Sequence, residues 1–358
     1  MSTIYDSVED VKEILFGSNG YNIEDIRNEV MKDIQSGKAT MPPQYLMMKI
    51  TNKCNSNCVY CNHAANKIGR EIKDQIPTEK ILNILDEAAN MGVKAVSISG
   101  GEPLVRDDVE VFVKKIVEHN MVPVLLTNGM LLKQRAKKLY ENGLRYFIVS
   151  LDSLEEEKYF NQRGVHLESV LEGIEELEKI KKLDDSVKIH VTPVVTAKNI
   201  SDMPEMIKQL SSRKIAVQIS PYHDFYKYKD NELEKYDSEI VEKVIDKILK
   251  MKKEGYLIAN SEAFLKHFNN FFNKKMIIPQ NYNCLAGYVS VYVDTYENVL
   301  PCWSDSFKPI GNLKNESLKE IWYGAKYQEY RKKMYNCMCK GCWFLCTGEL
   351  TILLNGEK

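Results

Sequence analysis

Three cysteines and a histidine lie close together in the stretch CNSNCVYCNH, residues 54–63. Cys54, Cys58 and Cys61 have the spacing C-x3-C-x2-C. Three such thiolates can bind three irons of a [4Fe–4S] cluster and leave the fourth iron open to another ligand. The alternative is a structural zinc ion with His63 as its fourth ligand. Because one residue separates Cys61 from His63, joint ligation by these two would be strained, so the spacing favours a cluster.

The remaining cysteines form a second group near the end of the printed sequence. In a reducing compartment, an odd total of 9 cysteines in two clusters indicates metal or redox chemistry instead of disulfides. A zinc ribbon is an alternative for this group, since a C-x2-C pair occurs in it. The group consists of Cys284, Cys302, Cys337, Cys339, Cys342 and Cys346.

Composition and charge give no sign of a nucleic-acid or membrane partner. The 358 residues include 49 basic and 50 acidic side chains, so no strong overall field is present. The opening MSTIYDSVEDVKEILF lacks the basic region of a secretory signal. No apolar run approaches the roughly 20 residues that span a bilayer. We therefore expect a cytoplasmic protein.

Short apolar strands alternate with amphipathic helices between about residues 45 and 220. In the helix predicted over TEKILNILDEAANMG, apolar residues recur at helical spacing, Thr78 is the expected N-cap and Gly92 the expected stop. Six β/α units with continuous apolar strands predict a parallel sheet covered by helices. The expected fold is α/β, a partial (β/α)6 TIM barrel, with a doubly wound sheet as the alternative. The six strands are YLMMKIT, KAVSIS, VPVLLT, RYFIVSL, KIHVTPVV and AVQIS.

The first cysteine group follows the first predicted strand directly, so it lies at the carboxyl edge where β/α barrels carry their active sites. Beyond the barrel, YVSVYVDTYENVLPC predicts a β-hairpin that turns at Asp294–Asn298 and brings Cys284 and Cys302 towards one another. The expected organisation is a helical N-terminal extension, a barrel, a helical bridge and a small α+β iron–sulfur domain, at residues 1–44, 45–230, 231–280 and 281–358 respectively.

With the aromatic Tyr60 before its last cysteine, the first group resembles the signature of the radical S-adenosylmethionine (SAM) superfamily. The resemblance, which covers roughly residues 45–350, implies that Cys54, Cys58 and Cys61 bind a [4Fe–4S] cluster whose open iron binds SAM. It further implies that the reduced cluster cleaves SAM to a 5′-deoxyadenosyl radical, which abstracts a substrate hydrogen. An external reductant such as flavodoxin or ferredoxin is the implied partner.

The segment SISGGEPLVRDD follows the second predicted strand. Its residues Gly100, Gly101, Glu102 and Pro103 match the GGEP motif of that superfamily, which lies beside the SAM amino group. Two glycines allow the backbone to approach a ligand closely, and their carbonyls or Glu102 can accept a hydrogen bond from an ammonium group. A diglycine after a strand is otherwise an ordinary turn.

Four more residues match SAM-binding positions of the superfamily. Ser150 and Asp152 resemble residues that bond the ribose hydroxyls, and N-capping of the next helix by Asp152 or Ser153 is the alternative. Arg163 in NQRGV matches an arginine that meets the SAM carboxylate. Asn128 in LLTNGM either lines the SAM pocket or forms an Asn-Gly turn.

The C-terminal cysteine group resembles the SPASM/twitch extension of radical SAM enzymes, which binds auxiliary [4Fe–4S] clusters. The segment CWSDSFKPIGNLKNESLKEIW is typical of it. Full SPASM domains have a further cysteine after the last C-x3-C pair, and none follows Cys346 here, so we expect the shorter twitch form with one auxiliary cluster. A second, incompletely ligated cluster is the alternative.

The resemblance implies that the auxiliary ligands are Cys284, Cys302 and two of the three last cysteines, with Cys342 and Cys346 preferred over Cys339. Cys337 is then a spare. It is either an ordinary cysteine or a hydrogen-atom donor to a product radical, as in epimerases of this family.

The expected activity is that of a radical SAM oxidoreductase acting on a small polar metabolite such as a sugar, aminocyclitol or nucleoside. Twitch relatives act on such molecules, and about 45 residues before the first strand are too few for a leader-peptide-binding domain. The alternative is a ribosomal-peptide maturase that forms thioethers, crosslinks or epimers. Alternatives from other classes are a zinc-stabilised binding protein and an iron–sulfur electron carrier.

The end of the sixth predicted strand, QISPYHDFYKY, offers polar side chains for a substrate. These are Gln218, Tyr222, His223 and Asp224, of which His223 is a candidate for proton transfer. An exposed histidine without a role is the alternative for His223.

Overall fold

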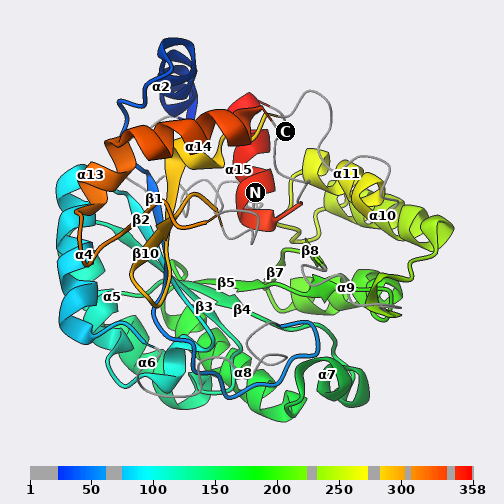
Figure 1. Ribbon diagram of the computed structural model, residues 1–358. Helices are drawn as coiled ribbons and strands as arrows, with labels where there is room; N and C mark the ends of the chain where they lie inside the picture. The colour runs from blue at the N-terminus through cyan, green and yellow to red at the C-terminus, as the bar shows by residue number, and fades with distance from the viewer. Residues whose placement is uncertain are drawn as a thin grey trace.

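The computed structural model describes residues 23–61, 75–223, 232–272, 283–302, 308–336 and 343–356. A curved sheet lies at the centre of this part of the chain, and helices cover its outer face (Figure 1). None of the helices described is both long enough and apolar enough to cross a bilayer.

Six parallel strands follow one another around the sheet, in the chain order that the sequence predicts. The structure therefore confirms the partial barrel. A short second sheet pairs β6 (Val194–Val195) with β8 (Ser220–Pro221) in parallel. The six strands are β1 (Tyr45–Lys49), β2 (Ala95–Ser99), β3 (Val122–Thr127), β4 (Tyr146–Val149), β5 (Lys188–Val191) and β7 (Ala216–Val217).

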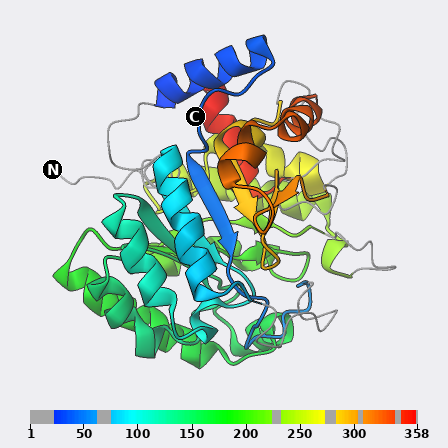
Figure 2. The same ribbon diagram turned by 60° about the vertical axis from the view of Figure 1, so that its left-hand side comes forward.

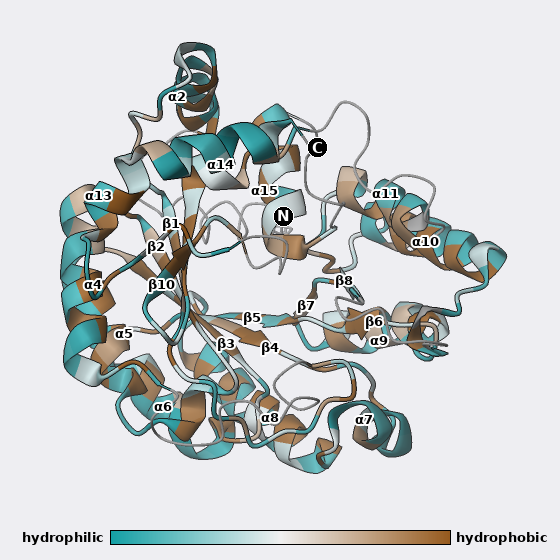
Figure 3. Cartoon of the chain, viewed as in Figure 1, coloured by the Kyte–Doolittle hydropathy of each residue, from teal (hydrophilic) through white to brown (hydrophobic). Residues whose placement is uncertain are grey.

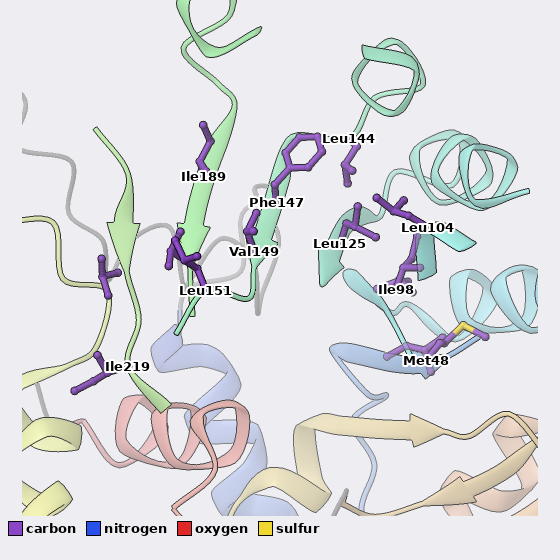
Figure 4. Packing of buried hydrophobic residues seen from close by; sticks show 14 of the residues in the cluster. Met48, Ile98, Leu104, Leu125, Leu144, Phe147, Val149, Leu151, Ile189 and Ile219 are labelled. Atoms are coloured by element: carbon purple, nitrogen blue, oxygen red, sulfur yellow. The ribbon is translucent and has the colours of Figure 1, made fainter. Parts of the chain in front are cut away.

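One row of apolar side chains crosses five of these strands. The register places Met48 beside Ile98, and then Leu125, Phe147 and Ile189 in turn, and all five are buried (Figure 4). Because successive side chains of a strand point to opposite faces, this row lies on the face covered by helices. Burial on both faces explains why the strands have continuous apolar sequences.

The outer helices pack an apolar stripe on the sheet and leave polar residues outward (Figure 3). In α4 the buried residues include Ile81, Leu85 and Ala88, and Gly92 ends the helix in the left-handed region, with φ of 98°, as expected. The expected N-cap is wrong by one residue: Pro77 is the N-cap, and the Thr78 hydroxyl donates to Asp108. The helices are α4 (Thr78–Met91), α5 (Val109–Glu118), α6 (Leu132–Glu141), α7 (Glu156–Arg163), α8 (Leu167–Leu183) and α9 (Met203–Ser212), with 3-10 turns η2 (Pro103–Val105) and η3 (Ile200–Asp202).

The predicted hairpin extends the sheet beyond its first strand. β9 (Ser290–Val293) pairs in parallel with β1, and β10 (Asn298–Leu300) pairs antiparallel with β9. The turn lies where expected, closed by a bond from Asp294 N–H to the Asn298 carbonyl. β11 (Gly311–Asn312) then pairs antiparallel with β10. The C-terminal segment is therefore joined to the barrel by strand pairing.

The remaining helices surround the start of the sheet and its open side. α15 contacts α2, α11 and α12 (Figures 1 and 2). In α11, Phe264 and Phe268 are fully buried. These elements are α2 (Ile23–Ser36), η4 (Glu232–Glu234), α10 (Ser238–Lys253), α11 (Glu262–Phe272), α12 (Ala286–Val289), α13 (Leu318–Tyr323), α14 (Ala325–Tyr335) and α15 (Leu345–Asn355).

Candidate functional site

The first three cysteines lie on residues 51–61, the cysteine loop, which follows β1 at the carboxyl edge of the sheet. Two backbone N–H groups of this loop bond the end of α7: Asn57 donates to the Arg163 carbonyl (3.0 Å) and Val59 to the Gln162 carbonyl (2.9 Å). The last carbonyls of a helix have no partner within it. The end of α7 is thereby satisfied, and the loop is fixed against it.

The three thiols of the loop differ in burial. Cys58 is buried, whereas Cys54 and Cys61 are half-buried, and none is in a disulfide. Ser56 N–H lies 3.4 Å from the Cys54 sulfur and Arg163 Nη1 lies 3.8 Å from the Cys58 sulfur. Burial raises the pKa of Cys54 to about 11 and raises that of Cys58. A cationic iron centre would reverse this preference and hold both as thiolates.

This donor set fits an iron–sulfur cluster. A zinc ion needs ligands that meet within about 2.3 Å of one point, whereas each cysteine of a cluster binds a separate iron. The N–H donors at two of the sulfurs suit anionic thiolates. His63, the fourth ligand of the zinc alternative, lies outside the described residues.

The GGEP segment packs directly against the cysteine loop. Gly101 N–H donates to the Thr51 carbonyl and Glu102 N–H to the Lys53 carbonyl, each over 2.8 Å. A Cβ atom on Gly100 would lie 2.3 Å from the Thr51 carbonyl oxygen, and one on Gly101 would lie 2.2 Å from that of Lys53. The glycines are required by this close approach of two backbones, whereas the sequence predicted either the approach of a ligand or an ordinary turn.

Glu102 is buried at the centre of a hydrogen-bond network. Its carboxylate accepts from the Thr127 hydroxyl (2.7 Å), Asn128 N–H (2.6 Å) and Leu104 N–H (3.0 Å). Burial raises the pKa of Glu102, and these three donors offset part of that rise. Pro103 begins η2 behind it. The carboxylate thus joins the GGEP segment to the end of β3.

Asn128 joins the end of β3 to the cysteine loop. Its side-chain N–H group donates to the Asn55 side-chain oxygen Oδ1 (2.7 Å) and to the Ser56 hydroxyl (2.8 Å). Its side-chain oxygen accepts from Met130 N–H, so the Asn-Gly turn is present as well. Ser150 is half-buried directly after β4, and its N–H donates to the Thr127 carbonyl.

Asp152 and Arg163 form a buried ion pair. Arg163 Nε and Nη2 lie 2.6 and 2.8 Å from the two Asp152 oxygens, and the two side chains are 7% and 0% exposed. Asp152 also accepts from the Tyr60 hydroxyl and from Val194 N–H. The alternative of N-capping by Asp152 is therefore wrong: Glu155 is the N-cap of α7. The structure brings Tyr60, Asp152 and Arg163 together beside Cys58.

The C-terminal cysteines that the structure describes lie against one apolar cluster. Cys302 is buried in it, and Cys284 and Cys346 pack on its edge. The Tyr292 hydroxyl, on β9, lies 3.9 Å from the Cys346 sulfur. Cys284, Cys302 and Cys346 therefore belong to or border the same apolar cluster. The predicted ligands Cys339 and Cys342 and the spare Cys337 lie outside the described residues.

His223 is half-buried, contrary to the alternative of an exposed loop histidine. Its Nδ1 lies 2.9 Å from the Pro221 carbonyl, and Trp343 N–H donates to its Nε2 over 3.0 Å. These partners define a neutral ring protonated at Nδ1. Burial lowers the pKa of His223 to about 4. The ring stacks on Phe344 and connects the barrel to the segment after Cys342; Asp224 lies outside the described residues.

Sequence reasoning missed some residues that shape the site. The Ser56 hydroxyl accepts from the Asn128 side chain, and the Thr127 hydroxyl donates to Glu102. These two bonds align the cysteine loop and the GGEP segment with the end of β3. Asn52 donates to the Tyr296 hydroxyl in the hairpin turn, so the C-terminal segment touches this loop. Their positions after apolar strands were a signal, but a polar residue at a strand end is too common to identify a function.

Two family models match the chain. That of the radical SAM superfamily matches residues 48–210, and that of SPASM, an iron–sulfur cluster-binding domain, matches residues 284–343. The first range contains the cysteine loop and the GGEP segment, and the second contains Cys284 and Cys302. Both parts of the resemblance are therefore confirmed, and with them the iron–sulfur clusters and SAM as cofactors.

Several GTP 3′,8-cyclases are similar in sequence. A probable GTP 3′,8-cyclase of Methanosarcina mazei is 32% identical over 250 residues, 64% of this chain and 68% of that protein. The enzyme of Helicobacter pylori strain HPAG1 is 26% identical over 302 residues, 82% of this chain and 92% of that protein. Others are matched over about half their length, such as that of Aliarcobacter butzleri, 34% identical over 57% of its length.

Two solved structures have a similar fold. SuiB of Streptococcus suis, bound to its precursor peptide SuiA, has a TM-score of 0.65 and 20% identity over 91% of this chain and 74% of that one. The structure of anSMEcpe with bound AdoMet has a TM-score of 0.64 and 21% identity over 86% of this chain and 88% of that one. At this identity the likeness concerns the fold alone.

Proposed function

Because the chain belongs to the radical SAM superfamily, we propose that Cys54, Cys58 and Cys61 bind its catalytic [4Fe–4S] cluster, with which the enzyme removes a hydrogen atom from an organic substrate. The cysteine loop carries this proposal: three thiols in the family spacing lie at the carboxyl edge, bonded to the GGEP segment. When bound, the cluster and SAM supply a 5′-deoxyadenosyl radical that abstracts this hydrogen. Oxidation, epimerisation and rearrangement all begin with that step.

The chain's own residues position these groups. Gly100 and Gly101 let the GGEP segment lie directly against the cysteine loop, and the backbone carbonyls of this segment are proposed to accept from the SAM amino group. Glu102 fixes that segment to β3, and Asn128 fixes the loop to the same strand end. The buried surroundings of Cys58 exclude water from the reacting region. Ser150, half-buried at the next strand end, is proposed to bond the SAM ribose.

The C-terminal segment is proposed to bind at least one auxiliary cluster through Cys284, Cys302 and Cys346. Their convergence on one apolar cluster supports this assignment. The contact of Asn52 with Tyr296 places the hairpin turn next to the cysteine loop. An auxiliary cluster in this segment would therefore belong to the part of the chain that contacts the cysteine loop.

We favour a peptide as the substrate. The SPASM match and the shared fold with SuiB, which binds a precursor peptide, support this class. Among the described residues, two arginines near the carboxyl edge are paired with carboxylates: Arg106 with Asp108, and Arg163 with Asp152. A triphosphate would have to compete with these carboxylates for the two arginines, whereas a peptide would not.

A nucleotide is the second candidate. The named sequence relatives are GTP 3′,8-cyclases, and two reach 32% identity over about two thirds of their length, 68% and 70%. A nucleotide also belongs to the class of small polar metabolites that the sequence predicts. For sugars and aminocyclitols that prediction stays a prediction.

The test is hydrogen transfer to SAM under anaerobic conditions. Reconstituted enzyme is incubated with SAM, a reductant and either deuterated GTP or deuterated synthetic peptides encoded beside the gene. We expect 5′-deoxyadenosine that contains deuterium with a peptide, and none of this product in Cys58→Ala. Deuterium from GTP would support the nucleotide candidate instead. No 5′-deoxyadenosine under any condition, with iron fully loaded, would refute the proposed function.

A further inference from the structure

Arg163 matches a position at which the superfamily binds the SAM carboxylate, but its contacts here are with the protein. Two of its nitrogens face Asp152 at 2.6 and 2.8 Å, and the third, Nη1, faces the Cys58 sulfur at 3.8 Å. The planar guanidinium is 5.3 Å from the centre of the Tyr60 ring. All three guanidinium nitrogens, and one face of the group, therefore contact protein atoms.

We infer that Arg163 acts on the catalytic cluster through its contact with the Cys58 sulfur, and that Asp152 holds Arg163 in place for that task. The inference rests on the proposed role of Cys58 as a cluster ligand. Arg163 is then a positioning residue that also sets the cluster's reduction potential.

The position of Arg163 is fixed from three directions. The two Asp152 oxygens accept from Nε and Nη2 of the guanidinium. Asp152 itself is fixed because it also accepts from Val194 N–H at 2.8 Å and from the Tyr60 hydroxyl. The carbonyl of Arg163 accepts from Asn57 N–H, one residue before Cys58. Gly164 follows in the left-handed region, with φ of 65°, and a Cβ atom there would meet Asn57 at 3.0 Å. Backbone and side chain together therefore keep Nη1 beside one sulfur.

The electrostatic consequence has a definite sign. Reduction adds an electron to a cluster whose thiolates already carry negative charge, so a nearby cation favours the reduced form and a nearby anion disfavours it. The guanidinium contacts the Cys58 sulfur, whereas Asp152 lies behind the guanidinium. Arg163 therefore raises the potential, and Asp152 partly opposes it. Low exposure limits solvent screening of both charges.

The experiment compares Arg163→Gln and Asp152→Asn in the reconstituted holoenzyme. The potential is read by EPR redox titration of the cluster whose signal changes when SAM is added, which separates it from auxiliary clusters. We expect a more negative midpoint potential in Arg163→Gln and a more positive one in Asp152→Asn. Tyr60→Phe is the matched control: it removes one hydrogen bond to Asp152 but no charge, and its potential should stay at the wild-type value. SAM affinity, measured by equilibrium binding, separates this effect from a role of Arg163 as a ligand of SAM alone.

Each outcome decides between the assignments. Shifts of the same sign in both charge variants, or an unchanged potential in Arg163→Gln, would overturn the inference. So would a loss of SAM affinity of tenfold or more with the potential unchanged, which is the behaviour of a carboxylate ligand. If Arg163→Gln fails to retain iron, Arg163→Lys replaces it, because lysine keeps the charge. The midpoint potential of Arg163→Lys should lie between that of the wild type and the value expected for Arg163→Gln. A potential of Arg163→Lys equal to that of the wild type refutes the guanidinium contact. Absence of any SAM-sensitive cluster in the wild type would instead refute the proposed function.

Discussion

Gly101→Ala provides a direct test of how the site is built. The new Cβ atom would lie 2.2 Å from the Lys53 carbonyl oxygen and 2.7 Å from that of Asn52. Real Cβ atoms essentially never come closer than 3.0 Å, so the GGEP segment and the cysteine loop must separate by at least the difference of 0.8 Å. Both neighbours are backbone atoms, which cannot move by a rotamer change. The separation therefore displaces the backbone beside Cys54.

The cost follows from the two bonds that cross this contact. Gly101 N–H to Thr51 and Glu102 N–H to Lys53 are each 2.8 Å long and would both lengthen. Each such bond contributes about 0.5–1.5 kcal/mol net, so we expect a loss of about 1–3 kcal/mol in the free energy of unfolding. A displacement near 1 Å at a reacting centre costs roughly 100-fold in rate. We expect a loss of that order in 5′-deoxyadenosine formation.

Gly255→Ala is the matched control. Gly255 has φ of 92° with nothing within 4 Å of an added Cβ, so alanine there adds only backbone strain of about 1–2 kcal/mol. The two variants should therefore unfold at similar urea concentrations, while only Gly101→Ala loses SAM affinity and 5′-deoxyadenosine formation. If Gly101→Ala forms 5′-deoxyadenosine within threefold of Gly255→Ala, the backbone contact does not position the site.

Three further variants test buried charges elsewhere. The pKa of His223 is lowered from 6.5 to about 4, so its contribution to stability is complete above pH 6.5 and is lost as pH falls towards 4, by at most about 3 kcal/mol; His223→Phe should lack this loss in urea unfolding. The pKa of Glu349 is raised from 4.5 to about 7 by burial, so stability is lost instead as pH rises from 4.5 through 7, again by at most about 3 kcal/mol, and Glu349→Gln should remove that slope. Arg331 is fully buried, donates to the Gly287 and Trp322 carbonyls and stacks on the Trp322 ring, so Arg331→Lys should lose about 1–3 kcal/mol of stability at pH 7.

The pH dependence of the free energy of unfolding is compared between each variant and the wild type. This comparison separates the substituted group from all others that titrate. A slope below pH 6.5 that persists in His223→Phe, or one above pH 4.5 that persists in Glu349→Gln, would assign the effect to another residue. Equal stability of Arg331→Lys and the wild type would mean that charge alone matters at that position.

The barrel was predictable because its signal is local. Each parallel strand is buried on both faces, so its apolar run stands out, and the row from Met48 to Ile189 needs only that run and the chain order. The hairpin turn at Asp294–Asn298 was predictable for the same reason. Its place in the sheet was not, because pairing of β9 with β1 joins residues far apart in sequence, and nothing in either strand specifies its neighbour.

Only those parts of the candidate site that form short sequence motifs were predictable. The cysteine triad and GGEP segment were found, but the partners of their side chains were not. Tyr60 and Asp152 are 92 positions apart, and Asn128 and Ser56 are 72 apart. The local sequence around a carboxylate that follows a strand is equally compatible with three roles: capping a helix, bonding a ribose and pairing with an arginine. Which of these occurs is decided by the register of neighbouring strands, which places Asp152 opposite the end of α7.

The same long-range bonds explain why the cysteine loop can be irregular and still hold its sulfurs in fixed positions. It has few bonds within itself, yet the end of α7, the GGEP segment and Asn128 each bond a different part of it. Each of these three supports follows a different strand: the GGEP segment follows β2, Asn128 follows β3 and α7 follows β4. Closure of the curved sheet therefore determines where the thiols lie, and disruption of any one support should displace the sulfurs without unfolding the barrel.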